Sequence, residues 1–268
     1  MASLLTVQAL YIYPIKSLGG ISVSEALAQE RGFQFDRRWM LVDKGGLFMS
    51  QRKHPKMALL QVALTSDGLE VFPKNDPTDR LKIPFEAGTG QYEEVQIWDD
   101  EVRAERVGKI YDLWFSNALN DQVTLVKMPE FPSRPVDPRY AHASEEVSFA
   151  DGMPYLIIGN ESLNDLNSKL EELVPMDRFR PNIVFDGGMA FEEDTWEFLE
   201  IGEVRFKGVK PCARCILTTV DQETAITSAE PLKTLSSYRK VGNKVLFGQN
   251  ALALESGKVR VGDSIRKG

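Results

Sequence analysis

The first half of the sequence is divided into short apolar runs, and each run ends at residues that form turns. Residues 5–13 alternate between apolar and polar side chains and stop at Pro14, and residues 39–42 lead into Asp43-Lys44-Gly45-Gly46. Another turn, Ser66-Asp67-Gly68, separates two further runs. Short alternating runs joined by Gly-containing turns are typical of antiparallel strands. Strands at this spacing predict a β-barrel or a β-sandwich.

Two segments have the apolar spacing of a helix instead. Apolar side chains at positions 110, 113, 114 and 118 would share one face of a helix over residues 110–119. Leucines at positions 163, 166, 170 and 173 predict a second, amphipathic helix. The runs at 183–185, 198–206, 216–220 and 251–254 predict strands. We therefore expect a β-rich α+β fold.

A proline-rich segment crosses the middle of the chain. Residues 129–139 contain four prolines, which exclude a regular helix and remove hydrogen-bond donors from a strand. This segment predicts a boundary between two domains, residues 1–130 and residues 131–268.

The charge balance argues against a nucleic-acid partner. Lys and Arg total 32 and Asp and Glu total 39, so the net charge is −7, whereas a polyanion normally meets a basic surface.

Two cysteines are too few for a disulfide scaffold and indicate a reducing compartment. The N-terminus lacks a charged leader followed by an apolar stretch, and no run is long and apolar enough to span a membrane. We expect a cytoplasmic protein.

The sharpest motif is Lys210-Pro211-Cys212-Ala213-Arg214-Cys215. A thioredoxin-like redox pair would begin a helix, but residues 216–220 favour a strand. A structural zinc site needs four ligands, and both histidines of the chain lie far away in sequence. Two buried cysteines that pack as small apolar side chains remain an alternative. Lys210 and Arg214 instead favour a thiolate, the form that binds soft metals.

Four other segments offer groups that could hold an anion. They are Tyr13-Pro14-Ile15-Lys16-Ser17, Phe35-Asp36-Arg37-Arg38 with the later Ser50-Gln51-Arg52, Asp151-Gly152-Met153 and Arg178-Phe179-Arg180-Pro181-Asn182. Taken singly, each has a plain structural alternative: a surface turn, an ion pair, an Asp-Gly turn and a strand edge. Because Pro181 favours an extended residue before it, Arg180 and Asn182 are expected on the same side of the chain.

Taken together, these motifs resemble a known family. Tyr-Pro-Ile-Lys-Ser, Asp-Arg-Arg-Trp, Phe-Ala-Asp-Gly-x-Pro, Arg-Phe-Arg-Pro-Asn and Cys-Ala-Arg-Cys-Ile-Leu-Thr-Thr-Val-Asp follow one another as in MOSC-domain proteins with a MOSC N-terminal β-barrel. This family includes the mitochondrial amidoxime-reducing component and its bacterial relatives. The resemblance implies an N-terminal MOSC-type β-barrel domain over residues 1–130, packed on a C-terminal MOSC β-barrel domain with a few helices over residues 131–268.

The resemblance also implies a molybdenum cofactor, Mo-molybdopterin, and the residues that bind it. The second cysteine of the pair, Cys215, would be the metal ligand and a catalytic residue, with Asp151 as a catalytic residue near the metal. The cofactor-binding residues would be Lys16, Ser17, Arg37, Gly152, Met153, Arg180, Asn182, Ala213 and Arg214. The role of Cys212 stays open.

The implied activity is reduction of small N-oxygenated compounds such as amidoximes, N-hydroxylated bases and hydroxylamines. Electrons would come from a separate haem or flavin protein, and the chain carries no membrane anchor like that of the mitochondrial members. An association with mitochondria stays compatible with the cytoplasmic expectation. The alternative is a cofactor or sulfur carrier without reductase turnover, with a persulfide on Cys215 or Cys212.

Overall fold

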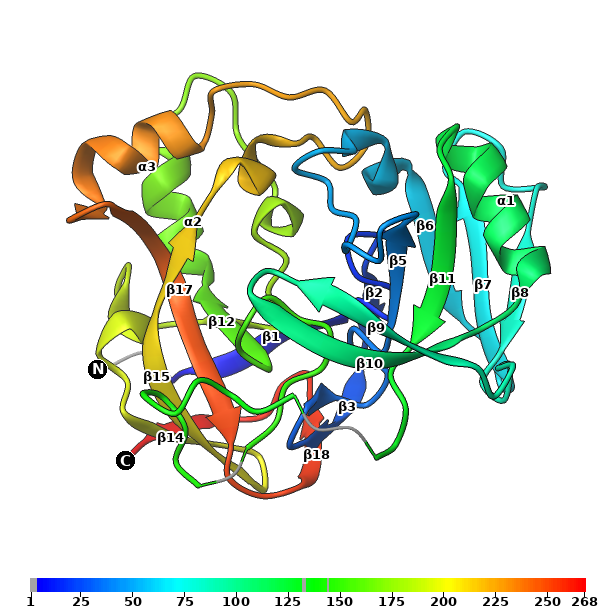
Figure 1. The fold of residues 1–268 in the computed structure, drawn as a ribbon. Helices are drawn as coiled ribbons and strands as arrows, with labels where there is room; N and C mark the ends of the chain where they lie inside the picture. Colours follow the sequence, from blue (N-terminus) through cyan, green and yellow to red (C-terminus); the bar gives the residue numbers. More distant parts are fainter. Residues whose placement is uncertain (1–3, 132–133, 144) are drawn as a thin grey trace.

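The computed structural model describes residues 4–131, 134–143 and 145–268, and strands are its main regular structure (Figure 1). The largest sheet has the order β19-β14-β15-β17-β12-β13-β1-β2, with β16 paired to β17. β12 and β13 pair in parallel, which requires the crossover that helix α2 supplies between them. The strands are β1 (Thr6–Ile12), β2 (Ile21–Val23), β12 (Tyr155–Gly159), β13 (Ile183–Asp186), β14 (Phe198–Ile201), β15 (Val204–Arg214), β16 (Lys240–Val241), β17 (Lys244–Ala253) and β19 (Ile265–Lys267).

Three smaller sheets complete the β structure. Their orders are β5-β11-β10-β9, β6-β7-β8 and β18-β3-β4. Both predicted turns are present, since Asp43 Oδ1 accepts the N–H of Gly45 and residues 65–67 join β6 to β7. The strands are β3 (Glu25–Gln29), β4 (Gly32–Phe33), β5 (Trp39–Asp43), β6 (Leu60–Leu64), β7 (Gly68–Pro73), β8 (Leu81–Pro84), β9 (Tyr92–Ile97), β10 (Asp100–Arg106), β11 (Val123–Lys127) and β18 (Gly257–Arg260). The expected β-rich α+β fold is confirmed.

The first strands of the chain belong to the sheet of the C-terminal half. β1 pairs with β13 through residues such as Leu10 and Ile183, and Figure 1 shows β1 crossing the centre of the molecule. β3 pairs with β18 in the same way. The division at residue 130 stays a prediction. With that boundary, each part would contribute a strand to a sheet of the other part: β1 pairs with β13, and β18 pairs with β3.

Helix α1 (Lys109–Leu119) confirms the helix expected over residues 110–119, but part of the predicted apolar face is wrong. Phe115 is fully buried, whereas Ile110 and Leu113 are exposed. Asp112 Oδ1 accepts the N–H of Leu125 on β11 and so turns the helix toward that strand. Phe115 then enters the core, with Trp114 partly buried beside it.

Helix α2 (Asn160–Asn167) is shorter than the leucine spacing predicts. Its last residue, Asn167, pairs through its side chain with both the N–H and the C=O of Val174. This contact closes a turn, so Leu173 is exposed rather than on a helix face. Another helix, α3 (Leu232–Tyr238), packs beside β17.

The proline-rich segment is irregular, as predicted, where the structure describes it. Residues 134–143 contain turns and one isolated bridge, between Pro135 and Glu146, while Pro132 and Ser133 lie outside the described residues. Within the described ranges, none of the helices has the length and apolar character needed to cross a membrane.

Candidate functional site

A cavity of about 290 Å³ lies where loops from both halves of the chain meet. Its walls come from the loop after β1, the segments on either side of β5, the loop before β12, the start of β13 and the end of β15. All eleven predicted site residues line this cavity: Lys16, Ser17, Arg37, Asp151, Gly152, Met153, Arg180, Asn182, Ala213, Arg214 and Cys215. Their roles in binding a cofactor stay predictions.

Cys215 lies just beyond the end of β15, at the cavity wall. The strand predicted over residues 216–220 is wrong, because a 3-10 turn, η4 (Ile216–Thr219), follows the cysteine. The hydroxyl of Thr218 donates to the carbonyl of Cys215 at 3.0 Å, and that of Thr219 donates to the carbonyl of Ile216 at 2.7 Å. Such local hydroxyl bonds compete with strand pairing. Both cysteines are free thiols, which keeps Cys215 available as a ligand.

Arg52 connects the Cys215 sulfur to Asp151. Arg52 donates through Nε to Cys215 Sγ at 3.1 Å and through Nη2 to Asp151 Oδ2 at 2.7 Å. Lys16 Nζ lies 2.6 Å from Asp151 Oδ1 and also donates to the carbonyl of Phe149. The sulfur, the carboxylate and both cations therefore form one connected network.

Burial and charge shift the pKa values in this network. Burial raises the pKa of Asp151, but Lys16 and Arg52 lower it more, to well below its ordinary value. Burial lowers the pKa of Lys16 to about 8, against the attraction of Asp151. About half of the Asp151 side-chain surface stays accessible from the cavity, so an ionised carboxylate faces whatever binds there.

A second cluster forms around the Tyr13 ring. The guanidinium groups of Arg37 and Arg180 lie 4.4 and 4.2 Å from the ring centre, within cation–π distance. The fully buried Asp36 accepts from Arg37 Nη1 at 2.5 Å and from the backbone N–H of Tyr13 at 2.8 Å. Asn182 Oδ1 accepts from Arg37 at 3.1 Å. This cluster fixes the positions of two cavity arginines.

The backbone around the cavity is strained at three residues. Ser17, Arg37 and Arg180 have φ values of 69°, 51° and 52°, in the left-handed region. The expectation that Arg180 is extended before Pro181 is therefore wrong, although Arg180 and Asn182 both still line the cavity. Strain of this kind in non-glycine residues gathers at functional sites.

The donor set of the cavity fits an anionic cofactor. Six cationic side chains line it, against the single carboxylate of Asp151; they are Lys16, Arg37, Arg52, Arg180, Lys210 and Arg214. Arg180 and Arg214 each keep a buried Nη2 without a hydrogen-bond partner among the described residues. Unpaired buried donors are costly, and phosphate or pterin acceptors would satisfy them.

Nine other residues line the cavity that were not among the predicted site residues, and three of them carry long polar side chains: Arg52, Lys210 and Asn250. Lys210 is adjacent to the cysteine pair in sequence. Arg52 lies in the segment Ser50-Gln51-Arg52, between β5 and the 3-10 turn at Pro55–Leu59, and nothing local in the sequence indicates that it reaches Cys215. The described residues contain no group of three or more His, Cys, Asp or Glu side chains placed to hold a metal ion. A metal at Cys215 would therefore take its other ligands from a cofactor or from solvent.

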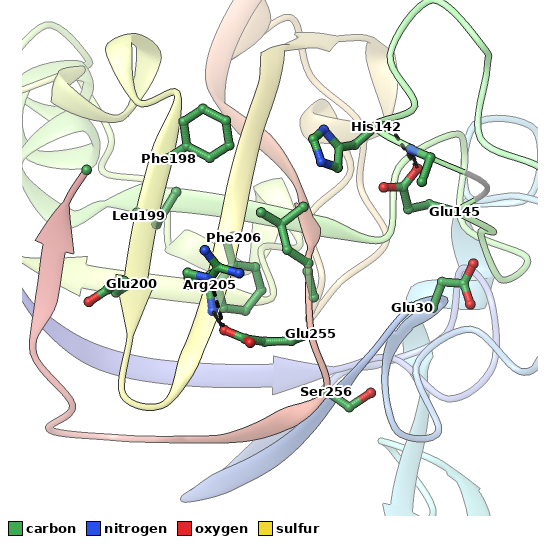
Figure 2. A pocket seen from close by; sticks show the side chains of 14 residues that line it. Glu30, His142, Glu145, Phe198, Leu199, Glu200, Arg205, Phe206, Glu255 and Ser256 are labelled. Carbon is green, nitrogen blue, oxygen red and sulfur yellow. Dashed lines mark hydrogen bonds and ion pairs between the residues drawn. The ribbon is translucent and has the colours of Figure 1, made fainter.

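A larger cavity of about 750 Å³ lies elsewhere, between the ends of β14, β15 and β17 (Figure 2). Three of its charged side chains already have partners, since Glu145 accepts the N–H groups of His142 and Ala143, and Glu255 pairs with Arg205. It contains neither cysteine nor any predicted site residue. Its size alone does not make it the reactive site.

Comparisons with known proteins agree with this arrangement. The MOSC N-terminal beta barrel domain matches residues 4–122, and the MOSC domain matches residues 144–266. Mitochondrial amidoxime-reducing component 1 and mitochondrial amidoxime reducing component 2 of Homo sapiens are each 34% identical to the chain, over 97% of it and 82% of their own length. Molybdenum cofactor sulfurase of Oryza sativa subsp. japonica is 31% identical over 90% of the chain and 32% of its own length. The chain therefore belongs to the family of MOSC-domain proteins with a MOSC N-terminal β-barrel domain, which includes the mitochondrial amidoxime-reducing components.

Proposed function

We propose that this protein is a molybdenum-cofactor-dependent reductase of small N-oxygenated compounds: amidoximes, N-hydroxylated bases and hydroxylamines. The observation that carries the proposal is the convergence of eleven residues from five separate segments on one cation-rich cavity with a free cysteine in its wall. Identity of 34% to amidoxime-reducing components over nearly the whole chain supports the same reaction class.

In this proposal, Cys215 is the only protein ligand of the metal. The thiolate is a soft ligand that suits molybdenum, and the cofactor's own dithiolene provides further sulfur. The phosphate and pterin would be held by Lys16, Ser17, Arg37, Arg180 and Asn182 and by the backbone at Gly152–Met153 and Ala213–Arg214. These cations supply the local positive charge that a chain of net charge −7 otherwise lacks.

The bound cofactor supplies the two-electron chemistry that breaks the N–O bond. The balanced reaction takes two electrons and two protons and yields the N–H compound and water. Asp151, held as a carboxylate by Lys16 and Arg52, can accept a hydrogen bond from an N–H or O–H of the substrate and so orient it. The buried Lys16, with a pKa of about 8, can exchange a proton beside that carboxylate near neutral pH.

Electrons would come from a separate haem or flavin protein. The chain has two cysteines in all, and an iron–sulfur cluster is usually held by four. A cytoplasmic location and an association with mitochondria both suit this function, and cell fractionation distinguishes them.

A matched pair of cysteine variants tests the proposal. The protein is produced with cofactor supply, and its molybdenum content and its benzamidoxime reduction with a chemical electron donor are measured. We expect Cys215→Ala to lose the metal and at least about 100-fold in activity, because a ligand is removed. Cys212→Ala should keep its metal, because the Cys212 sulfur packs against an apolar cluster and its hydrogen bond goes to the carbonyl of Ala213 at 3.9 Å. Full activity in Cys215→Ala would refute the proposal.

The sulfur-carrier alternative keeps some support from the similarity to a molybdenum cofactor sulfurase. It predicts a metal-free protein with cyanide-labile sulfur on Cys215 or Cys212. The same preparation distinguishes the two, because a stable metal with turnover favours the reductase.

A further inference from the structure

Arg52 makes three contacts that no other side chain of the cavity combines among the described residues. Its Nε donates to Cys215 Sγ at 3.1 Å, and its Nη2 donates to Asp151 Oδ2 at 2.7 Å. Its guanidinium carbon also lies 4.7 Å from the centre of the Trp98 ring. A planar guanidinium can make such bonds and stack at the same time, which an ammonium cannot.

Trp98 packs its ring against the Arg52 guanidinium. It lies at the tip of the β9–β10 hairpin, where its φ of 57° is left-handed and Gln96 Nε2 donates to its carbonyl at 2.9 Å. Its Nε1–H donates to Asp151 Oδ1 at 3.4 Å, and its ring packs on that of Phe48, with centres 5.0 Å apart. Trp98 and Asp151 therefore restrict Arg52 to the orientation that reaches the sulfur.

Both Arg52 and Trp98 lie in the part of the chain that matches the MOSC N-terminal barrel domain, whereas Asp151 and Cys215 lie in the part that matches the MOSC domain. The charged hydrogen bond to the sulfur thus crosses from one family domain to the other. If the N-terminal domain only supported the fold, none of its side chains would need to contact Cys215.

We infer that Arg52, held in place by Trp98 and Asp151, sets the reduction potential of the metal centre through its hydrogen bond to the Cys215 sulfur. This inference rests on the proposed function, because it takes Cys215 as the metal ligand. A cationic donor on a ligating sulfur withdraws electron density from the metal and stabilises the reduced state. Arg52 thereby raises the midpoint potential, and its removal lowers it.

Three variants of the loaded enzyme test the inference. Arg52→Gln keeps a polar side chain but removes the charge, and Arg52→Lys keeps the charge but removes the planar Nε–H that meets the sulfur. Arg103→Gln removes a charge from an exposed arginine of β10 that stacks on Tyr92 and does not line the cavity. Molybdenum content, circular dichroism and the midpoint potential, followed by the paramagnetic resonance signal of the metal, are measured for each.

We expect Arg52→Gln to have a lower midpoint potential and a kcat reduced about 10- to 100-fold at normal metal content, as for other residues that support a metal ligand. Arg52→Lys should recover only part of the shift, and Arg103→Gln should match the wild type. Since loss of Arg52 could also disturb the loop, Trp98→Leu and Trp98→Phe provide a second test. Trp98→Leu should shift the potential in the same direction, and Trp98→Phe, which keeps a ring, should shift it less.

The outcomes separate this inference from the proposed function. A wild-type protein without molybdenum would overturn both. A loaded and active wild type with an unchanged potential in Arg52→Gln and Trp98→Leu would overturn the inference alone. A variant that loses its metal but has an unaltered circular dichroism spectrum would assign Arg52 to cofactor retention and likewise overturn the inference.

Discussion

At the scale of single residues, the cavity depends on charges that are buried in pairs. Asp36 is fully buried and accepts from Arg37 and from the backbone of Tyr13, so it positions an arginine that is itself largely buried. Removing one partner of a buried pair leaves the other charge without compensation. The arginines of the cavity are therefore costly to hold unless acidic groups such as Asp36 stay in place.

This dependence predicts the stability of Asp36→Asn. We expect its free energy of unfolding, measured with urea, to fall by about 3 kcal/mol because Arg37 loses its buried counterion. Glu25→Gln breaks the exposed contacts with Lys258 and Arg260 and should leave the unfolding curve nearly unchanged. Equal stability of the two variants would contradict the prediction.

At the scale of helices, strands and turns, the elements that could be predicted from the sequence are those that depend on interactions between residues close together in the chain. The Asp43 turn and helix α1 formed where their residues indicated, since an Asx turn and a helical spacing need few distant partners. The strand expected after Cys215 did not form, because Thr218 and Thr219 bond to nearby carbonyls instead. Arg52 reaches the cavity only through tertiary packing, so its place near the sulfur could not be predicted from the sequence.

The contact between the 3-10 turn η3 (Glu192–Thr195) and the start of helix α2 predicts that the stability of the protein depends on pH. Glu193, in this turn, is fully buried and accepts from the N–H of Gly159 and the hydroxyl of Ser162 at the start of α2. Burial raises the pKa of Glu193 to about 7. In the folded state it therefore keeps a proton that the unfolded chain releases above its ordinary pKa of 4.5.

This difference in proton binding determines how the stability of the protein changes with pH. As the pH rises from about 4.5 to about 7, the unfolded state binds fewer protons than the folded state, so the free energy of unfolding falls. Glu193→Gln lacks this dependence, and the wild type should lose up to about 3 kcal/mol relative to it across that window. Denaturant curves at several pH values measure the difference, with the exposed Glu197→Gln as control. Parallel curves for wild type and Glu193→Gln would contradict the assignment.

At the scale of the whole molecule, the two family domains are bound together by exchanged strands and by the site. β1 contributes Val7, Leu10 and Ile12 to the core of the large sheet, together with side chains from the C-terminal half. Conversely, β18 of the C-terminal half pairs with β3 of the N-terminal half. The two halves are thus expected to unfold as one unit.

A fragment of residues 131–268 tests this cooperativity. Without β1 it exposes the edge of β13 and part of the core of the large sheet, so we expect no cooperative thermal transition from it alone. Adding a separately produced fragment of residues 1–130 should restore a transition if the strands can exchange in solution. A sharp transition in the isolated C-terminal fragment would show that it folds independently.

The pairing of β1 with β13 also has a consequence for synthesis on the ribosome. Residues 6–12 leave the exit tunnel long before residues 183–186, their partner strand. At roughly 5–20 residues per second, the wait lasts on the order of ten to thirty seconds. During that time the nascent chain exposes the edge of β1 that later pairs with β13. A chaperone that binds exposed strand edges would therefore be most useful at residues 6–12.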